Sequence, residues 1–205
     1  MNQHQVTKDF EKALCDYTGA KYAVAVSSCT AALFLCCKYH KVGLVSLPAR
    51  TYVSVPMAVI HAGGKVTFVP GWHWRGEYNL YPYPIWDSAR RFTGGMYSDY
   101  YWKDDQFVCV SFHASKILGL EQGGAILHDN EDADKWFRRA RFDGRSEGVP
   151  PKEDKFDMLG WHCYMNPSTA AQGLLKLHSL PKHNDDLPND DYPDLSQFEI
   201  FKSAA

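Results

Sequence analysis

Short apolar runs alternate with amphipathic segments along most of the chain, a pattern typical of buried strands and surface helices. An amphipathic helix is predicted over residues 10–17, ending at Gly19, and a buried strand over Tyr22–Val26. The alternation continues, with strands expected at 42–47, 66–69, 85–87, 107–112 and 123–127, and helices at 27–39, 52–62, 131–142 and 167–180. Strands that alternate with helices predict an α/β fold with a mostly parallel sheet flanked by helices.

The end of the chain has a different composition. Residues 184–193 are rich in Asp and interrupted by proline, which disfavours regular structure. We therefore divide the chain into a catalytic-type domain, residues 1–180, and an acidic, proline-containing tail, residues 181–205, which we expect to lie on the surface or to be mobile.

Composition limits the size of the fold, its binding partners and its location. At 205 residues, 45% of them hydrophobic, the chain is long enough for one substantial core. The formal net charge of -2 provides no general attraction to nucleic acid or to anionic membranes. Residues 1–12 lack the apolar run of a signal peptide, and no segment is apolar enough to cross a membrane, so we expect a cytoplasmic protein that does not bind membranes.

The cysteines and aromatic residues give weaker signals. None of the six cysteines forms a CxxC pair or a cluster with histidine at zinc spacing, so we expect reduced, partly buried thiols and no metal site. Aromatic residues are dense just before Asp87. They fit a packed core and a stacking surface equally well; the members are Trp72, Trp74, Tyr78, Tyr81 and Tyr83.

Three places on the predicted fold combine polar chemistry with a strand end. Lys116 follows a strand and a loop of small residues, so its amine is expected at a cleft where a strand ends. Asp87 closes an apolar strand, where it either projects into the same crevice or caps a helix. The turn Ser28–Thr30 precedes a helix, and its N–H and hydroxyl groups suit either a phosphate or a simple helix cap.

The order of these features resembles the DegT/DnrJ/EryC1/StrS family, the sugar aminotransferase branch of the fold-type I enzymes that use pyridoxal 5′-phosphate (PLP). The resemblance covers about residues 10–177, through segments 10–33, 48–54, 62–69 and 121–127, and it extends through residues 141–144 and 159–174. It implies the large domain of a fold-type I PLP-dependent transferase, with PLP as the cofactor.

Particular residues carry the resemblance. Lys116 falls where the family forms its internal aldimine, Asp87 where a carboxylate pairs with the pyridine nitrogen, Tyr52 where an aromatic ring stacks on the cofactor, and Ser111 where a hydroxyl binds the phosphate. The resemblance therefore implies Lys116 and Asp87 as catalytic residues. The full set implied to bind the cofactor is Ser28, Cys29, Thr30, Thr51, Tyr52, Asp87, Arg90, Ser111, His113, Lys116 and His162.

The chain also departs from the family pattern. Cys29 replaces the usual glycine of the phosphate turn, which narrows the approach of the backbone and suggests a shifted phosphate. Arg90 stands where Gln or His is usual, and it adds a cation that favours a phenolate or meets a substrate carboxylate. His162 replaces an Asn that reaches the cofactor of the neighbouring subunit, so the resemblance implies a homodimer with a composite active site.

Family resemblance favours an aminotransferase acting on a sugar or nucleotide-linked substrate. The alternative is a PLP-dependent decarboxylase of an amino acid, either free or attached to a nucleic-acid base or another large carrier; nucleic acid enters only as such a modified-base substrate. The chain is short between Val69 and Asp87 and shows no small domain after Leu180. We therefore expect an open site that suits a bulky or carrier-linked amine substrate, unless the tail or another protein covers it.

Overall fold

The computed structural model describes residues 4–100, 105–189 and 191–202. Helices and strands alternate along most of this part of the chain. The helices are α1 (Gln5–Thr18), α2 (Cys29–Tyr39), α3 (Ser54–His61), α4 (Met96–Tyr100), α5 (Glu131–Ala140), α6 (Pro167–Ser179) and α7 (Glu199–Lys202), with 3-10 turns at Pro151–Glu153 and Leu195–Gln197. The strands are β1 (Tyr22–Val26), β2 (Leu44–Pro48), β3 (Lys65–Val69), β4 (Tyr78–Asn79), β5 (Ile85–Ser88), β6 (Phe107–Ser111) and β7 (Gly124–His128). Within these ranges no helix is long and apolar enough to cross a bilayer.

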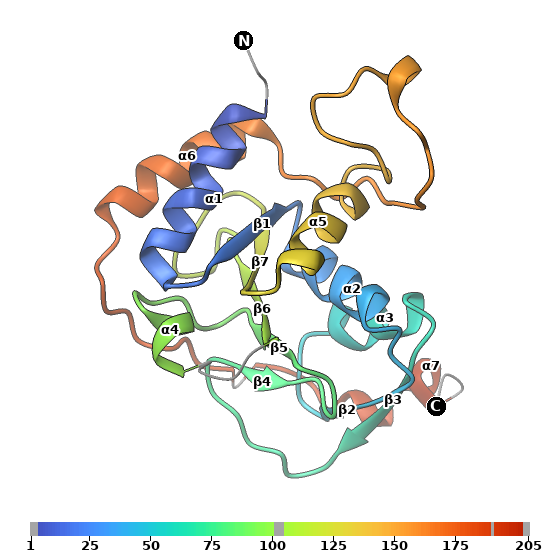
Figure 1. Ribbon diagram of the computed structural model, residues 1–205. Coiled ribbons are helices and arrows are strands. Elements are labelled where there is room, and N and C mark those ends of the chain that lie inside the picture. Colours follow the sequence, from blue (N-terminus) through green and yellow to red (C-terminus); the bar gives the residue numbers. More distant parts are fainter. Residues whose placement is uncertain (1–3, 101–104, 190, 203–205) are drawn as a thin grey trace.

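A mixed sheet of five strands, in the order β1-β7-β6-β5-β4, lies at the centre of the molecule (Figure 1). β5 and β6 pair in parallel, whereas β7 is antiparallel to both of its neighbours and β4 is antiparallel to β5. β1, β5 and β6 therefore share one direction, and β2 and β3 form a separate parallel pair. The predicted α/β fold is confirmed. β7 runs against β6 because a loop without a helix joins them, whereas a parallel pair needs a longer crossover.

Helices cover both faces of the sheet. Successive residues of a strand point to opposite faces, and along β1 Val24 and Val26 face one core while Ala23 and Ala25 face the other. α1 and α6 lie side by side over the second of these cores, and α2 and α5 lie over the first (Figure 1). Every residue of β6 and β7 is buried, as expected for strands between two helical layers.

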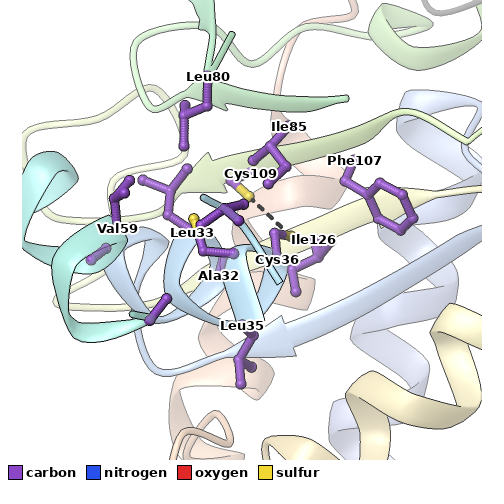
Figure 2. Close-up of a cluster of buried hydrophobic side chains, with 14 of the residues drawn as sticks. Ala32, Leu33, Leu35, Cys36, Val59, Leu80, Ile85, Phe107, Cys109 and Ile126 are labelled. Atoms are coloured by element: carbon purple, nitrogen blue, oxygen red, sulfur yellow. Dashed lines mark hydrogen bonds between the residues drawn. The ribbon is translucent and has the colours of Figure 1, made fainter. Parts of the chain in front are cut away.

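The core beneath α2 contains most of the thiols. Cys36 of α2 and Cys109 of β6 are fully buried, with their sulfur atoms 3.7 Å apart, among Leu33, Ile126 and other apolar side chains (Figure 2). The cysteines are free thiols, with Cys15 and Cys163 only partly buried. The prediction of reduced, partly buried cysteines is therefore confirmed.

Element boundaries depart from the predictions where a proline or a cap sets them. The strand Tyr22–Val26 forms as predicted, and α1 ends at Gly19, whose φ of 81° suits a residue without Cβ. α3 begins at Ser54 instead of the predicted residue 52, with Pro56 in its first turn, where proline is tolerated. Thr51 and Tyr52 consequently lie on a loop before the helix.

The tail packs against the body of the molecule. Residues 184–189 and 191–193 form no helix or strand, as predicted, but two short helical turns follow them. The backbone N–H of Leu195 donates to the carbonyl of Ala49 at 2.8 Å, and the Leu195 side chain is buried. Phe201 packs on Phe68 of β3, with ring centroids 5.6 Å apart. The tail is thus fixed to the loop and strand that follow β2.

A buried ionic network joins α1, β1 and α5. Arg141, directly after α5, is 1% exposed and Glu11 of α1 is 3% exposed. The Glu11 carboxylate accepts from Arg141, from Nη1 of Arg138 at 2.7 Å and from the backbone N–H of Ala25 at 2.9 Å. Burial opposes the charge of Glu11, but the two arginines outweigh burial and hold the pKa of this carboxyl below its usual value.

We expect Glu11→Ala to lower the free energy of unfolding by about 3 kcal/mol, because it removes one of the two carboxylates that pair with the buried Arg141 and leaves Glu147, at 2.7 Å, as its remaining counter-ion. Chemical denaturation at neutral pH measures this loss, and Glu153→Ala, at an exposed position, is the matched control. Because the pKa of Glu11 is lowered in the folded state, its contribution is present above the unfolded pKa and is lost as the pH falls through the folded value. The difference from Glu11→Gln should therefore shrink below about pH 4.3; a constant difference would contradict the ionic role.

Candidate active site

A cavity of about 530 Å³ opens at the edge of the sheet where β1, β5 and β6 end. Strands of one direction bring the segments at their carboxyl ends together, and this is where α/β proteins commonly bind ligands. The cavity is lined by all of the predicted site residues except His162, namely Ser28, Cys29, Thr30, Thr51, Tyr52, Asp87, Arg90, Ser111, His113 and Lys116. Residues from four separate segments, 28–30, 51–52, 87–90 and 111–116, thus meet at one place.

Asp87 lies on β5, and its carboxylate is buried in the wall of this cavity, with the residue 4% exposed. Oδ2 accepts a hydrogen bond from the Tyr78 hydroxyl at 2.8 Å, and Oδ1 accepts one from the backbone N–H of Ala89 at 3.0 Å. The bond from Ala89 shows that Asp87 also caps the turn after β5. Burial raises the pKa of Asp87, and these hydrogen bonds and the charge of Lys116 oppose the rise.

The turn Ser28–Thr30 lines the cavity and starts α2. Ser28 is the N-cap, and its Oγ accepts from the N–H of Ala31 at 3.1 Å. The turn packs closely on β7, since a Cβ added at Gly124 would lie 2.5 Å from the nitrogen of Cys29. The free N–H groups of a first helical turn, together with the positive end of the helix dipole, suit an anion.

The Cys29 side chain turns inward from this position. Its sulfur lies 3.5 Å from the carbonyl oxygen of Cys109 and 3.9 Å from Oδ1 of Asp87, and the residue is only 8% exposed. Burial, followed by the nearby charge of Asp87, raises the pKa of Cys29 well above its usual value. The thiol is thus a protonated, weak donor beside the carboxylate.

Lys116 is held by the compact loop that follows β6. Its backbone N–H donates to the carbonyl of His113 at 2.8 Å, and Nδ1 of His113 lies 3.0 Å from Oγ of Ser115. Ser111, at the end of β6, accepts from the N–H of His113 at 3.4 Å. Burial and then the charge of Arg90 lower the pKa of Lys116, while Asp87 opposes this effect. A lowered pKa makes the neutral, nucleophilic form of an amine more accessible.

The tail forms part of the cavity wall. Asp191 and Tyr192 line the cavity, and the Arg90 guanidinium lies 4.5 Å from the ring centre of Tyr192. Nε of Arg90 donates to the Tyr192 hydroxyl at 2.8 Å, and Nη2 donates to Asp191 at 2.9 Å. Tyr192 also stacks on Trp74 and lies near Tyr52, with ring centroids 6.1 and 6.2 Å apart. The sequence predicted an open site unless the tail covers it. The tail does cover part of the cavity.

His162 lies outside this cavity. It borders a separate hollow with His4, Arg141 and neighbouring residues, and its side chain is 71% exposed. Nδ1 of His162 is 3.0 Å from Oδ2 of Asp143. Within one chain, His162 is thus not brought together with the other predicted site residues.

Tyr78 and Tyr192 line or adjoin the cavity but are not among the site residues predicted from the sequence. Tyr78 belongs to the aromatic cluster whose role was left open, and the structure buries it beside Asp87, while Trp74 of the same cluster lines the cavity. Alternation along the short strand β4 was the available signal for Tyr78. No local pattern marks Tyr192, because its position depends on how the irregular tail crosses the molecule.

The profile of the DegT/DnrJ/EryC1/StrS aminotransferase family matches residues 1–71 and 99–186. The chain therefore belongs to this family, whose aminotransferases carry PLP or its amino form PMP. The match leaves out residues 72–98, the segment that contains Trp74, Tyr78, Asp87 and Arg90.

Curated relatives support the same membership. The chain is 25% identical to the UDP-4-amino-4,6-dideoxy-N-acetyl-beta-L-altrosamine transaminase of Campylobacter jejuni, over 86% of this chain and 57% of that protein. It is also 25% identical to the GDP-perosamine synthase of Caulobacter vibrioides, over 85% of this chain and 57% of that protein. The chain thus spans just over half the length of these relatives.

Solved structures share the fold. DesV of S. venezuelae has a TM-score of 0.68 at 18% identity, covering 85% of this chain and 57% of its own. NtdA of Bacillus subtilis, solved with bound PMP, has a TM-score of 0.67 at 20% identity, covering 85% of this chain and 48% of its own. The cavity offers the groups that PLP requires: an amine, a buried carboxylate, a helix N-terminus with hydroxyls, and an aromatic ring.

We expect Tyr192→Ala to loosen the tail, because the cation–π contact with Arg90 and the stacking on Trp74 together contribute about 1–2 kcal/mol. If opening is rapid, limited proteolysis within residues 186–198 should accelerate roughly 5- to 30-fold. Cleavage rates followed by mass spectrometry measure this effect. Ile200→Ala, at an exposed position of the same tail, is the control, and equal rates for both variants would show that Tyr192 does not anchor the tail.

Proposed function

We propose that this protein is a PLP-dependent aminotransferase that acts on a sugar linked to a nucleotide. The observation that carries the proposal is the meeting of Lys116, Asp87 and the Ser28–Thr30 turn in one cavity. These residues come from three segments far apart in sequence, and only Lys116 and the turn lie within the residues that the family profile matches. The position of Asp87 in the cavity is therefore support that is independent of the profile.

Each part of PLP has a partner among these residues. The N-terminus of α2, with Ser28, Thr30 and Ser111, is suited to the phosphate, and Asp87 to the pyridine nitrogen. Lys116 supplies the amine that holds the aldehyde, and Tyr52, with 56% of its surface exposed beside the cavity, supplies a ring face. When bound, PLP supplies an electron sink for negative charge at the substrate carbon.

The charges of the site suit proton transfer at that carbon. Asp87 keeps a proton on the pyridine nitrogen only while it is itself ionised, and the donors around it favour that state. Lys116, whose pKa is lowered, is suited to take a proton at Nζ from the substrate carbon and to return it. Tyr192 and Trp74 stack on each other in the cavity wall, and their rings are suited to limiting the access of water from that side.

The substrate class is inferred from the relatives, whose names specify UDP-linked and GDP-linked sugars. The test is incubation of the purified protein with PLP, an amino-acid donor and a nucleotide-linked keto-sugar, with products analysed by mass spectrometry. Replacement of the carbonyl oxygen by an amino group supports the proposal. Loss of CO₂ from the amino acid without amination of the sugar would instead establish a decarboxylase.

Borohydride reduction of the PLP-loaded protein should place the pyridoxyl group on Lys116, as judged by peptide mapping. Lys116→Ala should remove this label and lower turnover at least about 100-fold, because the group that transfers the proton is lost. Lys176→Ala is the matched control, because Lys176 lies on α6 and donates to the carbonyl of Gly119, which is in the same loop as Lys116. Labelling of another lysine in the unmodified chain would refute the assignment.

We further infer a homodimer in which His162 of one subunit faces the cofactor site of the other. His162 is exposed on the segment between α5 and α6, which extends away from the sheet (Figure 1). The same segment exposes Phe156 and Leu159, at 61% and 87%. Apolar side chains at such exposure beside a site residue favour a subunit contact.

Mixing the Lys116→Ala and His162→Ala chains tests this arrangement. In a composite dimer, each mixed dimer contains one intact site, so random exchange should restore about a quarter of the normal activity. The restored activity must exceed the mean of the two variants measured separately. A mixture that only averages them, or a protein that sediments as a monomer with full activity, would refute the composite site.

A further inference from the structure

Tyr78 lies opposite Asp87 in the sheet. The two residues are register partners on the antiparallel strands β4 and β5, so their side chains lie on the same face. Tyr78 is 2% exposed, and its hydroxyl donates to Oδ2 of Asp87 at 2.8 Å. Both residues belong to the segment between residues 71 and 99 that the family profile does not match.

Thr51 extends this contact into a chain of hydrogen bonds. Its Oγ1 lies 2.5 Å from the hydroxyl oxygen of Tyr78, and the residue is 1% exposed. A phenol has one hydrogen, and Tyr78 gives it to Asp87, so the Thr51 hydroxyl must be the donor to Tyr78. The direction is therefore Thr51 to Tyr78 to Asp87, and each bond strengthens the next in a buried setting.

These two hydrogen bonds offset the free-energy cost of burying the negative charge of Asp87. Burial raises the pKa of Asp87, and the Tyr78 hydrogen bond is the largest effect that lowers it. Burial, and next the charge of Asp87, raise the pKa of Tyr78 well above its usual value, so the phenol keeps its proton and remains a donor. The titratable groups that act on Asp87 from the packed elements are Tyr78, Lys116, Cys29, Cys109 and Tyr192.

We propose that Tyr78 is a positioning residue that keeps Asp87 ionised and turned toward the pyridine nitrogen, with Thr51 fixing the Tyr78 hydroxyl. This inference rests on the proposed function, in which Asp87 pairs with that nitrogen. Thr51 then acts through Tyr78, although the sequence predicted direct contact between Thr51 and the cofactor.

Tyr78 also packs as an ordinary core residue, so the test must separate its hydroxyl from its ring. The ring lies against Trp74 and Trp72, with centroids 4.6 and 6.3 Å away, and Tyr78→Phe retains those contacts. Binding is measured for PLP and for 1-deaza-PLP, in which carbon replaces the ring nitrogen. Both ligands carry the same phosphate and aldehyde, so only the interaction with the ring nitrogen differs.

We expect Tyr78→Phe to raise the dissociation constant for PLP roughly 10-fold or more, which is typical for loss of a hydrogen bond to a charged group. The constant for 1-deaza-PLP should not rise, since that ligand gains nothing from an ionised Asp87. Tyr83→Phe is the matched control, because the Tyr83 hydroxyl accepts from the N–H of Gly43 at 2.6 Å and does not line the cavity. It should leave both constants unchanged.

Equal weakening of both ligands by Tyr78→Phe would show a purely structural role and overturn the inference. If Tyr78→Phe does not fold, Thr51→Val removes the donor to Tyr78 and should give a smaller loss confined to PLP; an equal loss for both ligands again overturns the inference. Failure of the unaltered protein to bind PLP would refute the proposed function itself. If only the role of Tyr78 is wrong, the unaltered protein still binds PLP normally.

Discussion

The carboxylate of Asp87 is buried in the central sheet, and several groups around the cavity stabilise its negative charge. An ionised carboxylate without partners is strongly disfavoured in such a place. Here the backbone N–H of Ala89, the Tyr78 hydroxyl and the Cys29 thiol surround its oxygens, and Lys116 adds a positive charge. These partners come from different elements, so the state of the carboxylate depends on the packing of the whole sheet edge.

The structure explains why Cys29 and Arg90 can replace the residues usual in the family. A glycine at position 29 would leave the space beside Asp87 without a side chain, whereas the thiol fills it and turns away from the helix N-terminus. Arg90 anchors the tail, since Nε donates to Tyr192 and Nη2 to Asp191, while its charge still lowers the pKa of Lys116. Arg90 therefore both holds the tail over the cavity and lowers the pKa of the Lys116 amine.

The segment between residues 71 and 99, which the family profile does not match, supplies several residues of the cavity. It supplies Asp87, the hydrogen-bond donor Tyr78, the cavity-lining Trp74 and Arg90, which holds the tail, although its regular structure is limited to the short strand β4, the strand β5 and the start of α4. A short segment of this kind must place its side chains by packing, and the aromatic rings of Trp72, Trp74 and Tyr78 provide that packing. The aromatic cluster thus serves both the core and the site.

The sequence by itself determined the α/β alternation and the buried strand Tyr22–Val26, because strand periodicity is a local signal. The order of its motifs predicted a common site for Lys116, Asp87 and the Ser28–Thr30 turn, and these residues line one cavity. The tertiary structure alone decided the direction of β7, the donor from Tyr78 to Asp87 and the place of Tyr192 in the cavity wall. The direction of β7 and the Tyr78 hydrogen bond depend on how neighbouring strands pair, which periodicity within one strand does not specify. The place of Tyr192 depends on contacts between segments far apart in the chain, and an irregular tail carries no periodicity from which its path could be predicted.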